Sequence, residues 1–488
     1  MSDGRVEDGL PIASAADAAA EIGDDDAVLV SGFGSVGYPK AVPSALASAA
    51  AAGDRDPGLT VVSGGSVGPE IDRELVAAGA VDRRFPYQAN GTIREAINAG
   101  EVAFHDRNIS SLGDEVQYGG LVDPDVAIVE ALAVGGDWLI PTTSIGQTPA
   151  FVSAADRLIV EVNAAVPTEV ARFHDIYRRG RPPNREPIPL SEPGERIGDD
   201  RLWFDPAKLV AVVETNERDR PYEFREPTAD DRAIADNLRG FLEGEVERSP
   251  LFGDSLRIQF GVGSLGNALM AALGDADLGD RDLIYFGEVI QDGLLDLLDD
   301  GKLASASATS LALSAEGQDR LFDAVDRYAE NVVLRPGDLS NSPALIDRFG
   351  VVGVNSALEV DLFGHVNSTH VGGTDVMNGV GGSADFNRNA VLSVLALPST
   401  AKGGDVSRIV PMVPHVDHTE HDIDVVVTER GVADLRGNDP RETASALIDA
   451  CAHPDYAGDL RGYLEEAGRA GSHVPHDLDA AFDWRSDR

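Results

Sequence analysis

The sequence predicts an α/β protein with two similar domains, each built on an open, mostly parallel sheet. Short apolar runs alternate with segments of helical pattern along the whole 488-residue chain. Continuous runs of this kind are typical of parallel strands that helices cover on both faces. A chain of this length also exceeds what one hydrophobic core usually organises, which indicates two domains.

The expected strands coincide with apolar, β-branched runs in both halves of the chain. They are 27–30, 59–62, 126–129, 158–162 and 209–213, followed by 256–260, 283–286, 351–354, 391–397 and 423–427. The stretch 177–199 is rich in proline and charge, so we expect a long surface excursion there. The polar stretch 214–231 is expected to link the halves. This predicts an N-terminal domain at 1–225 and a C-terminal domain at 226–488.

The two halves repeat a common pattern. Residues 27–46 and 256–273 both read as a strand, a glycine-rich turn and a helix. Later in each half, residues 131–144 (ALAVGGDWLIPTTS) parallel residues 357–370 (ALEVDLFGHVNSTH). A pattern that recurs in the same order indicates two related domains that arose by internal duplication.

The charge of the chain excludes two classes of partner. Its formal net charge is −43, with 83 acidic and 40 basic residues, and only four of the basic residues are lysines: Lys40, Lys208, Lys302 and Lys402. So negative a field repels nucleic acid and anionic membranes. We expect a surface adapted to a salt-rich cytoplasm, because charges are screened within about 3 Å at 1 M ionic strength.

Cysteine usage and hydropathy point to the same compartment. The single cysteine, Cys451, excludes an internal disulfide and a cysteine-rich metal site. No basic start followed by an apolar core opens the sequence, and no apolar run reaches the ~18 residues of a membrane span. We therefore expect a cytoplasmic protein.

Two glycine-rich turns make a dinucleotide-dependent dehydrogenase a competing interpretation. Residues 32–37 and 261–266 both fit G-x-G-x-x-G after an expected strand, a pattern that lets backbone N–H groups approach a phosphate. The fingerprint also needs an acid at the end of the next strand. Asp54, Asp56 and Asp275 lie in polar loops instead, so a tight turn without a ligand is an equal alternative for each copy.

Two further motifs have ordinary alternatives. Residues 64–68 (GGSVG) fit the nucleophile elbow of a serine hydrolase, but no triad partner stands out, so a glycine turn before a helix at Pro69 is the favoured interpretation. His415, His418 and His421 lie among carboxylates, yet their spacing does not gather them on one helix face. We interpret this segment as a polar loop bordering a site, and we expect no metal.

Glu288 follows an expected buried strand at 283–286. Gly287 starts a turn, and the pattern from Val289 onward predicts a helix with four inward leucines at 294, 295, 297 and 298. Ligands of open α/β sheets bind at the carboxyl ends of strands, where Glu288 would lie. The alternative is an acidic residue in the first helical turn that stabilises the helix dipole.

Three downstream loops are dense in glycine and small polar residues. They are residues 364–369, 377–383 and 398–404, and the last carries Lys402. Flexible loops are the simple interpretation. The interleaved asparagines, serines and lysine favour a preorganised site rich in backbone hydrogen-bond donors.

Eight motifs in fixed order resemble the acetyl-CoA hydrolase/transferase family, which includes succinyl-CoA:acetate CoA-transferases. The motifs are 37–43 (GYPKAVP), 86–100, 140–146 (IPTTSIG), 173–177 (FHDIY), 287–293 (GEVIQDG), 365–390, 398–422 and 428–437 (TERGVADLRG). The resemblance covers nearly the whole chain. It implies two related α/β domains of the CoA-transferase type, usually in a homodimer.

The resemblance also implies roles for individual residues. Glu288 matches the family's catalytic glutamate, and the Gly382 N–H is expected to stabilise an oxyanion beside it. The residues expected to contact coenzyme A are Gly261, Val262, Gly263, Ser264, Leu265, Leu358, Asn378, Gly382 and Lys402. Those expected to read the substrate carboxylate are Asn341, Glu429 and Arg220.

The implied reaction moves CoA between acetyl-CoA, or another short acyl-CoA, and a small carboxylate such as succinate. It passes through a glutamyl-CoA thioester and needs no cofactor, because CoA is itself a substrate. Hydrolysis of acetyl-CoA by the same glutamate stays open, as do an NAD-linked dehydrogenase and a non-catalytic CoA-binding regulator.

Overall fold

The computed structural model describes residues 4–86, 90–469 and 471–486. Its contacts divide the chain into two compact units. Unit 1 comprises Met1–Glu223 and Tyr285–Leu345, and unit 2 comprises Phe224–Ile284 and Ile346–Arg488. The segment that carries Glu288 thus clusters with the N-terminal half of the chain. The domain boundary at 225/226 stays a prediction.

The described part of unit 1 contains a nine-stranded sheet. The strands run in the order β4-β3-β2-β1-β5-β6-β8, with β7 beside β5 and β9 beside β7. Their bounds are β1 (Ala27–Val30), β2 (Leu59–Ser63), β3 (Val81–Phe85), β4 (Ala103–Phe104), β5 (Val126–Val134), β6 (Trp138–Pro141), β7 (Arg157–Asn163), β8 (Leu202–Trp203) and β9 (Leu209–Thr215). All pairings are parallel except those of β6 with β5 and with β8.

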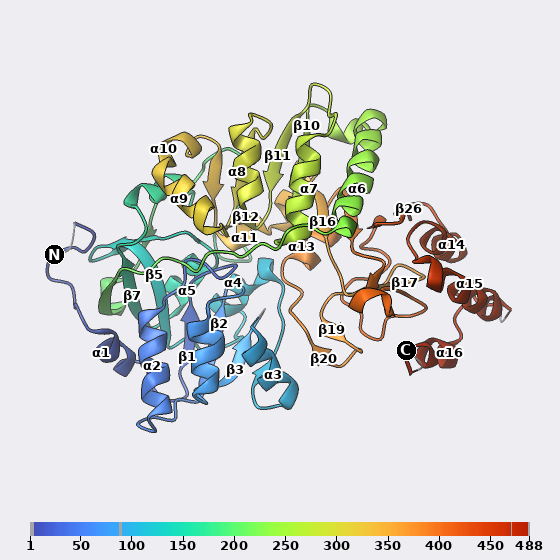
Figure 1. The fold of residues 1–488 in the computed structure, drawn as a ribbon. Coiled ribbons are helices and arrows are strands. Elements are labelled where there is room, and N and C mark those ends of the chain that lie inside the picture. Colours follow the sequence, from blue (N-terminus) through green and yellow to red (C-terminus); the bar gives the residue numbers. More distant parts are fainter. Residues whose placement is uncertain (1–3, 87–89, 470, 487–488) are drawn as a thin grey trace. The chain divides into compact units, whose positions relative to one another are not determined.

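Helices cover both faces of this sheet, which explains its continuous apolar strands. Val28 and Val30 of β1 face a core that α1 (Ala15–Ala20), α2 (Ala41–Ala51) and α3 (Gly91–Ala99) close (Figure 1). Because successive side chains point to opposite faces, Leu29 faces the other side. There α5 (Thr148–Ala154) contacts β1 and β5, and α4 (Ile109–Gln117) packs on α5.

The second segment of unit 1 adds two short parallel pairs and a set of helices. β12 (Val289–Ile290) pairs with β14 (Ser310–Leu311), and β13 (Ser305–Ala308) pairs with β15 (Val332–Leu334). The helices are α8 (Asp292–Asp299), α9 (Ala315–Asp323), α10 (Val325–Tyr328) and α11 (Gly337–Ser340). The boundaries between the units fall within β11 (Asp282–Phe286) and α12 (Pro343–Phe349).

Unit 2 contains parallel strands with an antiparallel edge. β10 (Ser255–Phe260), β16 (Val352–Asn355), β21 (Leu392–Ala396) and β25 (Val425–Thr428) are parallel, and β26 (Gly431–Asp434) pairs antiparallel with β25. The helices are α6 (Ala229–Arg248), α7 (Ser264–Gly274), α13 (Ser383–Asn389), α14 (Pro440–Ala450), α15 (Pro454–Gly468) and α16 (Leu478–Ser486). Leu447 of α14 and Leu460 of α15 pack in one core with Val426 of β25.

Short strands in unit 2 shape the loops between these elements. β17 (Glu359–Asp361) lies between β18 (Val366–Asn367) and β24 (Ile409–Val410). β19 (His370–Val371) pairs with β20 (Asp375–Val376), and β22 (Thr400–Ala401) pairs with β23 (Val406–Ser407). Among the described residues, no helix is long and apolar enough to cross a membrane.

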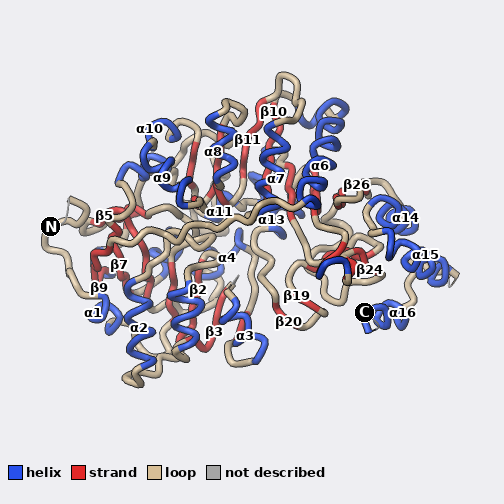
Figure 2. The backbone as a smooth tube through the Cα atoms, in the orientation of Figure 1, coloured by secondary structure: helices blue, strands red, loops and turns tan. Residues whose placement is uncertain are grey.

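The predicted fold class is confirmed: strands and helices alternate along the chain (Figure 2). Every expected strand overlaps an observed one. The helix expected from Val289 onward is wrong at its start. Val289 and Ile290 form β12, because they pair with Ser310 and Leu311, and α8 begins only at Asp292. Of the four leucines expected inward, Leu298 is only partly buried.

A buried ion pair in unit 1 leads to a stability prediction. Arg84 Nε of β3 lies 2.8 Å from Asp72 Oδ1, and both side chains are at most 2% exposed. Replacing Arg84 with Met is expected to lower the free energy of unfolding by about 3–5 kcal/mol, because Asp72 would keep a buried, uncompensated charge. Urea unfolding measures this change.

The matched control is Arg73→Met. Arg73 is the neighbour of Asp72 in the chain and pairs with Glu74 at 3.5 Å, but both side chains are well exposed. Its loss is expected to cost at most about 1 kcal/mol. If both substitutions lowered the free energy of unfolding equally, burial of the Arg84–Asp72 pair would not explain the loss.

A second prediction concerns acid stability. His174 is buried, with Nε2 3.0 Å from the Thr142 carbonyl and Nδ1 3.2 Å from the Asp200 carbonyl, and burial lowers its pKa to about 4. Between pH 6.5 and 4 the unfolded chain binds a proton at this imidazole that the folded chain does not, so the free energy of unfolding falls as pH falls. The contribution is roughly 3 kcal/mol across this window. Unfolding curves of His174→Gln should show a flatter dependence on pH over the same range, and an unchanged slope would refute the assignment.

Candidate active site

Glu288 lies in a turn between β11 and β12. Its carbonyl oxygen accepts hydrogen bonds from the backbone N–H groups of Thr309 (2.9 Å) and Ser310 (3.2 Å). The interpretation of Glu288 as a dipole-stabilising residue in a first helical turn is wrong, because α8 starts four residues later. The turn is instead held by a neighbouring chain segment.

Residues 143–146 of unit 1 hold residues 309–311 in place and are themselves contacted by a further segment. The Ile145 N–H donates to the Thr309 carbonyl (2.9 Å), and the Leu311 N–H donates to the Thr143 carbonyl (3.0 Å). The Gly146 carbonyl then accepts from the N–H of Gly337, the first residue of α11 (2.7 Å). The IPTTSIG motif is therefore an internal support of the Glu288 turn.

Asn341 fixes the carboxylate itself. It follows α11 directly, is fully buried, and its Nδ2 donates to Glu288 Oε1 over 2.9 Å. Glu288 as a whole is only partly buried. Burial, and then the negative charge of Glu288, raises the pKa of Tyr285. An oriented, partly desolvated carboxylate is suited to nucleophilic attack.

Arg220 lies at a hollow in unit 1, where its partner is Glu70. Its guanidinium pairs with Glu70 Oε1 at 2.9 Å and is half exposed. It lines a hollow of about 330 Å³ whose other walls are Ser35, Tyr38, Val67, Gly68, Pro69, Asn90, Pro221, Tyr222 and Glu223. Tyr222 packs in one apolar cluster with Phe33 and Val289, so the wall of this hollow reaches the residue that follows Glu288.

The first glycine-rich turn does not form a dinucleotide site. Backbone N–H groups at the start of α2 are already occupied by the Glu161 carboxylate, which accepts from Lys40 (2.8 Å), Ala41 (3.1 Å) and Val42 (2.6 Å). No phosphate could bind there without displacing a buried carboxylate. Gly37 has φ +65° and lies so close to Ser144 that an added Cβ would fall 2.7 Å from the Ser144 Cβ. The turn therefore serves packing.

The second glycine-rich turn, in unit 2, is more open. Gly263 precedes α7 with φ +137° and has no side chain to cap the helix. Gly261, Val262 and Leu265 line a hollow of about 60 Å³, and Val262 is 40% exposed. Five predicted CoA contacts, Gly261 to Leu265, thus lie on one accessible turn.

Asn378 and Gly382 lie on a glycine loop that polar contacts hold within unit 2. The Asn378 side chain donates to the Ser368 carbonyl (2.9 Å). Asp417 accepts from the Ser368 N–H (2.6 Å) and from the Thr369 hydroxyl (2.9 Å). Gly382 is buried and directly precedes α13.

The histidine segment supports the same loop. His418 is buried, its pKa is lowered by that burial, and its Nε2 lies 3.2 Å from the hydroxyl of Ser383, the residue after Gly382. His415 lies 3.2 Å from Asp417, whereas His421 is exposed beside Glu420. Within the described ranges, no group of three or more His, Cys, Asp or Glu residues could hold a metal ion.

The remaining predicted site residues of unit 2 lie in separate loops. The Leu358 N–H donates to the Asn367 carbonyl (2.9 Å), and Lys402 is exposed in a tight turn with φ +51°. Glu429 accepts from Ser399 N–H (2.8 Å) and pairs with Arg430 (3.0 Å). Burial disfavours the Glu429 carboxylate, but the hydrogen bonds from Ser399 outweigh it and lower its pKa.

Comparison with known proteins decides the family. The N-terminal domain of the acetyl-CoA hydrolase/transferase family matches residues 10–214, and its C-terminal domain matches residues 317–464. A succinyl-CoA:acetate CoA-transferase of Clostridium kluyveri is 44% identical over 96% of this chain and 88% of its own. The chain belongs to the acetyl-CoA hydrolase/transferase family. An acetyl-CoA hydrolase of Eremothecium gossypii is 41% identical over 93% of this chain and 89% of its own.

Membership of this family leaves no support for the dehydrogenase interpretation. The crystal structure of RipA from Yersinia pestis matches the fold with a TM-score of 0.72, at 22% identity, over 93% of this chain and 97% of that one. The protein is an enzyme of the CoA-transferase and acetyl-CoA hydrolase type. The dehydrogenase interpretation is wrong, in agreement with the occupied start of α2.

Sequence reasoning missed the residues that hold the Glu288 turn. Thr309 and Ser310 act through backbone N–H groups, which leave no mark of their own in a side-chain pattern. The available signal was the run of small polar residues at 305–310 (SASATS), which allows close approach of neighbouring backbones.

The contact between Asn341 and Glu288 generates a prediction. Asn341→Ala removes the donor to Oε1, and hydrogen bonds to charged groups are worth about 1.5–3 kcal/mol, so the turnover rate should fall roughly ten- to a hundredfold. Rates of CoA exchange between acetyl-CoA and succinate measure this. Asn331→Ala, which removes a surface hydrogen bond to the Ala304 carbonyl, is the control and should keep its rate. A normal rate for Asn341→Ala would show that Glu288 needs no such orientation.

Proposed function

We propose that this enzyme transfers CoA from acetyl-CoA, or another short acyl-CoA, to a small carboxylate such as succinate through a thioester on Glu288. The observation that carries the proposal is the hydrogen bond that orients the Glu288 carboxylate, 2.9 Å from Asn341 Nδ2, in a turn at the end of a strand. The similarity to the succinyl-CoA:acetate CoA-transferase of Clostridium kluyveri supports the substrate class.

The first half of the reaction transfers CoA to the enzyme. A Glu288 oxygen attacks the thioester carbonyl, the C–S bond breaks, and a mixed anhydride and CoA thiolate result. The thiolate then attacks the glutamyl carbonyl, which forms the glutamyl-CoA thioester and releases the carboxylate of the donor. No proton or water is consumed. Because covalent catalysis divides the transfer in two, the carboxylate product leaves before the acceptor binds.

The second half repeats these steps in reverse with the acceptor. Its carboxylate oxygen attacks the glutamyl thioester and expels CoA thiolate, and the thiolate attacks the acceptor carbonyl of the new anhydride. The acceptor leaves as its CoA thioester, and Glu288 is again a free carboxylate. Each tetrahedral intermediate carries an oxyanion, and we assign the Gly382 N–H as one donor to it. One such donor is typically worth about 2.7–4 kcal/mol of the barrier.

The residues of unit 2 that match the family's CoA contacts complete the proposal. We assign CoA to the turn Gly261–Leu265, Leu358, Asn378, Gly382 and Lys402. Lys402 is exposed and would meet an anionic group of CoA as a compact point charge. Asn341, Arg220 and Glu429 are assigned to the substrate carboxylate, Glu429 through its contacts to Ser399 and Arg430 rather than by direct attraction.

Hydrolysis of acetyl-CoA is the second candidate, because relatives of similar identity are acetyl-CoA hydrolases. Water would then resolve the same glutamyl thioester.

We also propose that the enzyme works as a homodimer in a salt-rich cytoplasm. The 83 acidic residues against 40 basic ones support the salt adaptation.

Glu288→Gln tests the proposal. The amide keeps an oxygen that can accept from Asn341 but is not a nucleophile, so CoA exchange should fall about 10³-fold or more. The control Glu316→Gln changes an exposed carboxylate in the first turn of α9 and should stay within about twofold of the parent. Full activity of Glu288→Gln would refute the mechanism.

The kinetic pattern distinguishes transfer from hydrolysis. Initial rates with varied acetyl-CoA and succinate should give parallel double-reciprocal lines, as expected when the enzyme carries CoA between two half-reactions. Release of free CoA should be much slower without succinate than CoA exchange with it. Equal rates would identify a hydrolase.

A further inference from the structure

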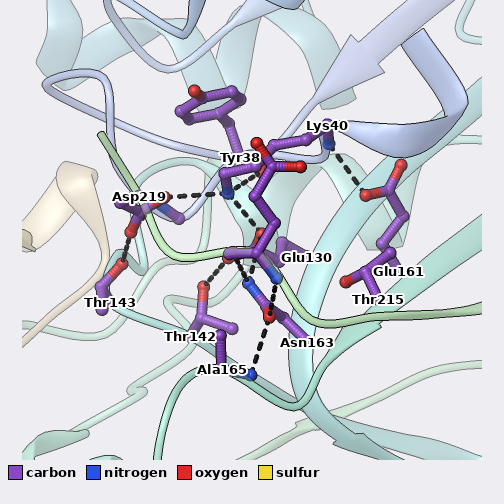
Figure 3. A network of polar contacts seen from close by, with 12 residues as sticks. Tyr38, Lys40, Glu130, Thr142, Thr143, Glu161, Asn163, Ala165, Thr215 and Asp219 are labelled. Carbon is purple, nitrogen blue, oxygen red and sulfur yellow. Dashed lines mark hydrogen bonds and ion pairs between the residues drawn. The ribbon is translucent and has the colours of Figure 1, made fainter. Parts of the chain in front are cut away.

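Lys40 is a buried cation in an acidic protein that has only three other lysines. Its side chain is 4% exposed, and its Nζ donates to Glu130 Oε2 (2.6 Å) and to the Tyr38 carbonyl (3.0 Å). Asp219 Oδ1 lies 3.0 Å from the same nitrogen (Figure 3). Burial opposes the charge of Lys40, but Asp219 and Glu130 outweigh it and raise the pKa of the amine, so Lys40 stays charged.

The two carboxylates that Lys40 joins belong to different parts of unit 1. Glu130 lies within β5, where its carboxylate also accepts from Thr142 (2.8 Å) and from Asn163 of β7 (3.1 Å). It is part of the rigid sheet. Asp219 lies beyond β9, in the segment that leaves the sheet. Lys40 therefore ties this departing segment to the centre of the sheet (Figure 3).

Further contacts converge on Asp219. Both of its carboxylate oxygens accept from the Gly37 N–H (3.1 Å each), and one also accepts from the Thr143 hydroxyl (2.5 Å). Its carbonyl oxygen accepts from Gln318 Nε2 (3.3 Å). With the Lys40 contact, the position of residue 219 is thus determined from several directions.

The next residues along the chain line the hollow of about 330 Å³. Arg220, Pro221 and Tyr222 all face it, and Tyr222 packs with Val289, the residue after Glu288. Arg220 itself is half exposed and pairs with Glu70. The place of the Arg220 guanidinium in the hollow depends on where the backbone of Arg220 lies. The contacts described above fix the chain at Asp219, one residue earlier.

We propose that Lys40 and Asp219 are positioning residues that place Arg220 and its wall of the hollow for the acceptor carboxylate, without touching the substrate themselves. This inference rests on the proposed function, in which Arg220 reads that carboxylate. A purely structural role is the competing explanation. Buried ion pairs add little stability over apolar residues of similar size, which leaves positional definition as the better reason for this one.

Two matched substitutions separate these explanations. Asp219→Asn removes the carboxylate on the side of the departing segment, and Glu130→Gln removes the one on the side of the sheet. Each takes a single buried partner from the same lysine. With acetyl-CoA and succinate as substrates, Asp219→Asn should raise the KM for succinate roughly tenfold, because Arg220 is displaced. Its KM for acetyl-CoA and its rate of glutamyl-thioester formation should stay within about twofold of the parent.

In Glu130→Gln the amide oxygen can still accept from Lys40 while the amide N–H donates to the Thr142 hydroxyl, so the link to the sheet is kept. In Asp219→Asn the amide N–H would face the Gly37 N–H, to which both carboxylate oxygens are bound. Glu130→Gln should therefore lower the melting temperature and leave both KM values within about twofold of the parent. If both substitutions raise the KM for succinate equally, or if neither does, the positioning role is wrong. Should Asp219→Asn fail to fold, Thr143→Val, which removes only one donor to Asp219, should raise the same KM by roughly threefold.

Combination with Arg220→Gln tests the route of the effect. If Asp219 acts through Arg220, adding Asp219→Asn to Arg220→Gln should not raise the KM for succinate further. Additive increases would show that Asp219 acts elsewhere and would overturn the proposal. Failure of the proposed function is a separate outcome, because then no glutamyl thioester forms from acetyl-CoA in the unaltered enzyme either.

Discussion

The mechanism we propose depends on one constraint, the fixed orientation of the Glu288 carboxylate in a turn that contacts from other segments hold in place. Two backbone N–H groups donate to the Glu288 carbonyl, and the Asn341 side chain donates to one oxygen of the Glu288 carboxylate. A free carboxylate is a weak nucleophile in water, because hydration stabilises it and no partner directs it. The structure supplies direction through Asn341, and Glu288 is only partly buried. Each supporting element around the turn makes sense as a means of keeping this arrangement rigid.

The acidic character of the chain sharpens the question of how an anionic substrate is accepted. The 83 acidic residues repel an anionic substrate, so its binding depends on where the basic residues lie. Unit 1 shows how: Lys40 is fully used inside the protein, where it ties a departing segment to the sheet, while Arg220 remains half exposed at the hollow. In our proposal the buried cation serves geometry and the accessible one serves recognition. The start of α2, which could bind an anion on its own, is occupied by the Glu161 carboxylate.

The elements that could be predicted were those whose cause is local. All ten expected strands exist because buried parallel strands need continuous apolar runs, and these are visible in one dimension. The position of Glu288 after such a strand made it one candidate beside a helix-dipole interpretation, and the family resemblance then favoured the catalytic role. The start of the next element was mispredicted, since β12 exists only through pairing with residues about twenty positions later, a contact that no local pattern records. Asn341 came only from the family resemblance, because a single buried asparagine has no periodic signature.

The dehydrogenase alternative failed for a similar reason. The glycine spacing at 32–37 is real, but the meaning of that spacing depends on Glu161, which lies far along the chain and occupies the helix start. Likewise, the histidine segment at 415–421 proved to be a support of the loop of Gly382 through His418, a role that only the folded contacts of unit 2 reveal.

The most direct test of the central claim is to trap the bond to Glu288. The protein is incubated with acetyl-CoA, treated with borohydride, digested and analysed by mass spectrometry. Our account predicts that the peptide containing residue 288 is the one reduced, with its glutamate converted to an alcohol, and that omission of acetyl-CoA abolishes the change. An unmodified Glu288 in protein that is actively exchanging CoA would contradict the account.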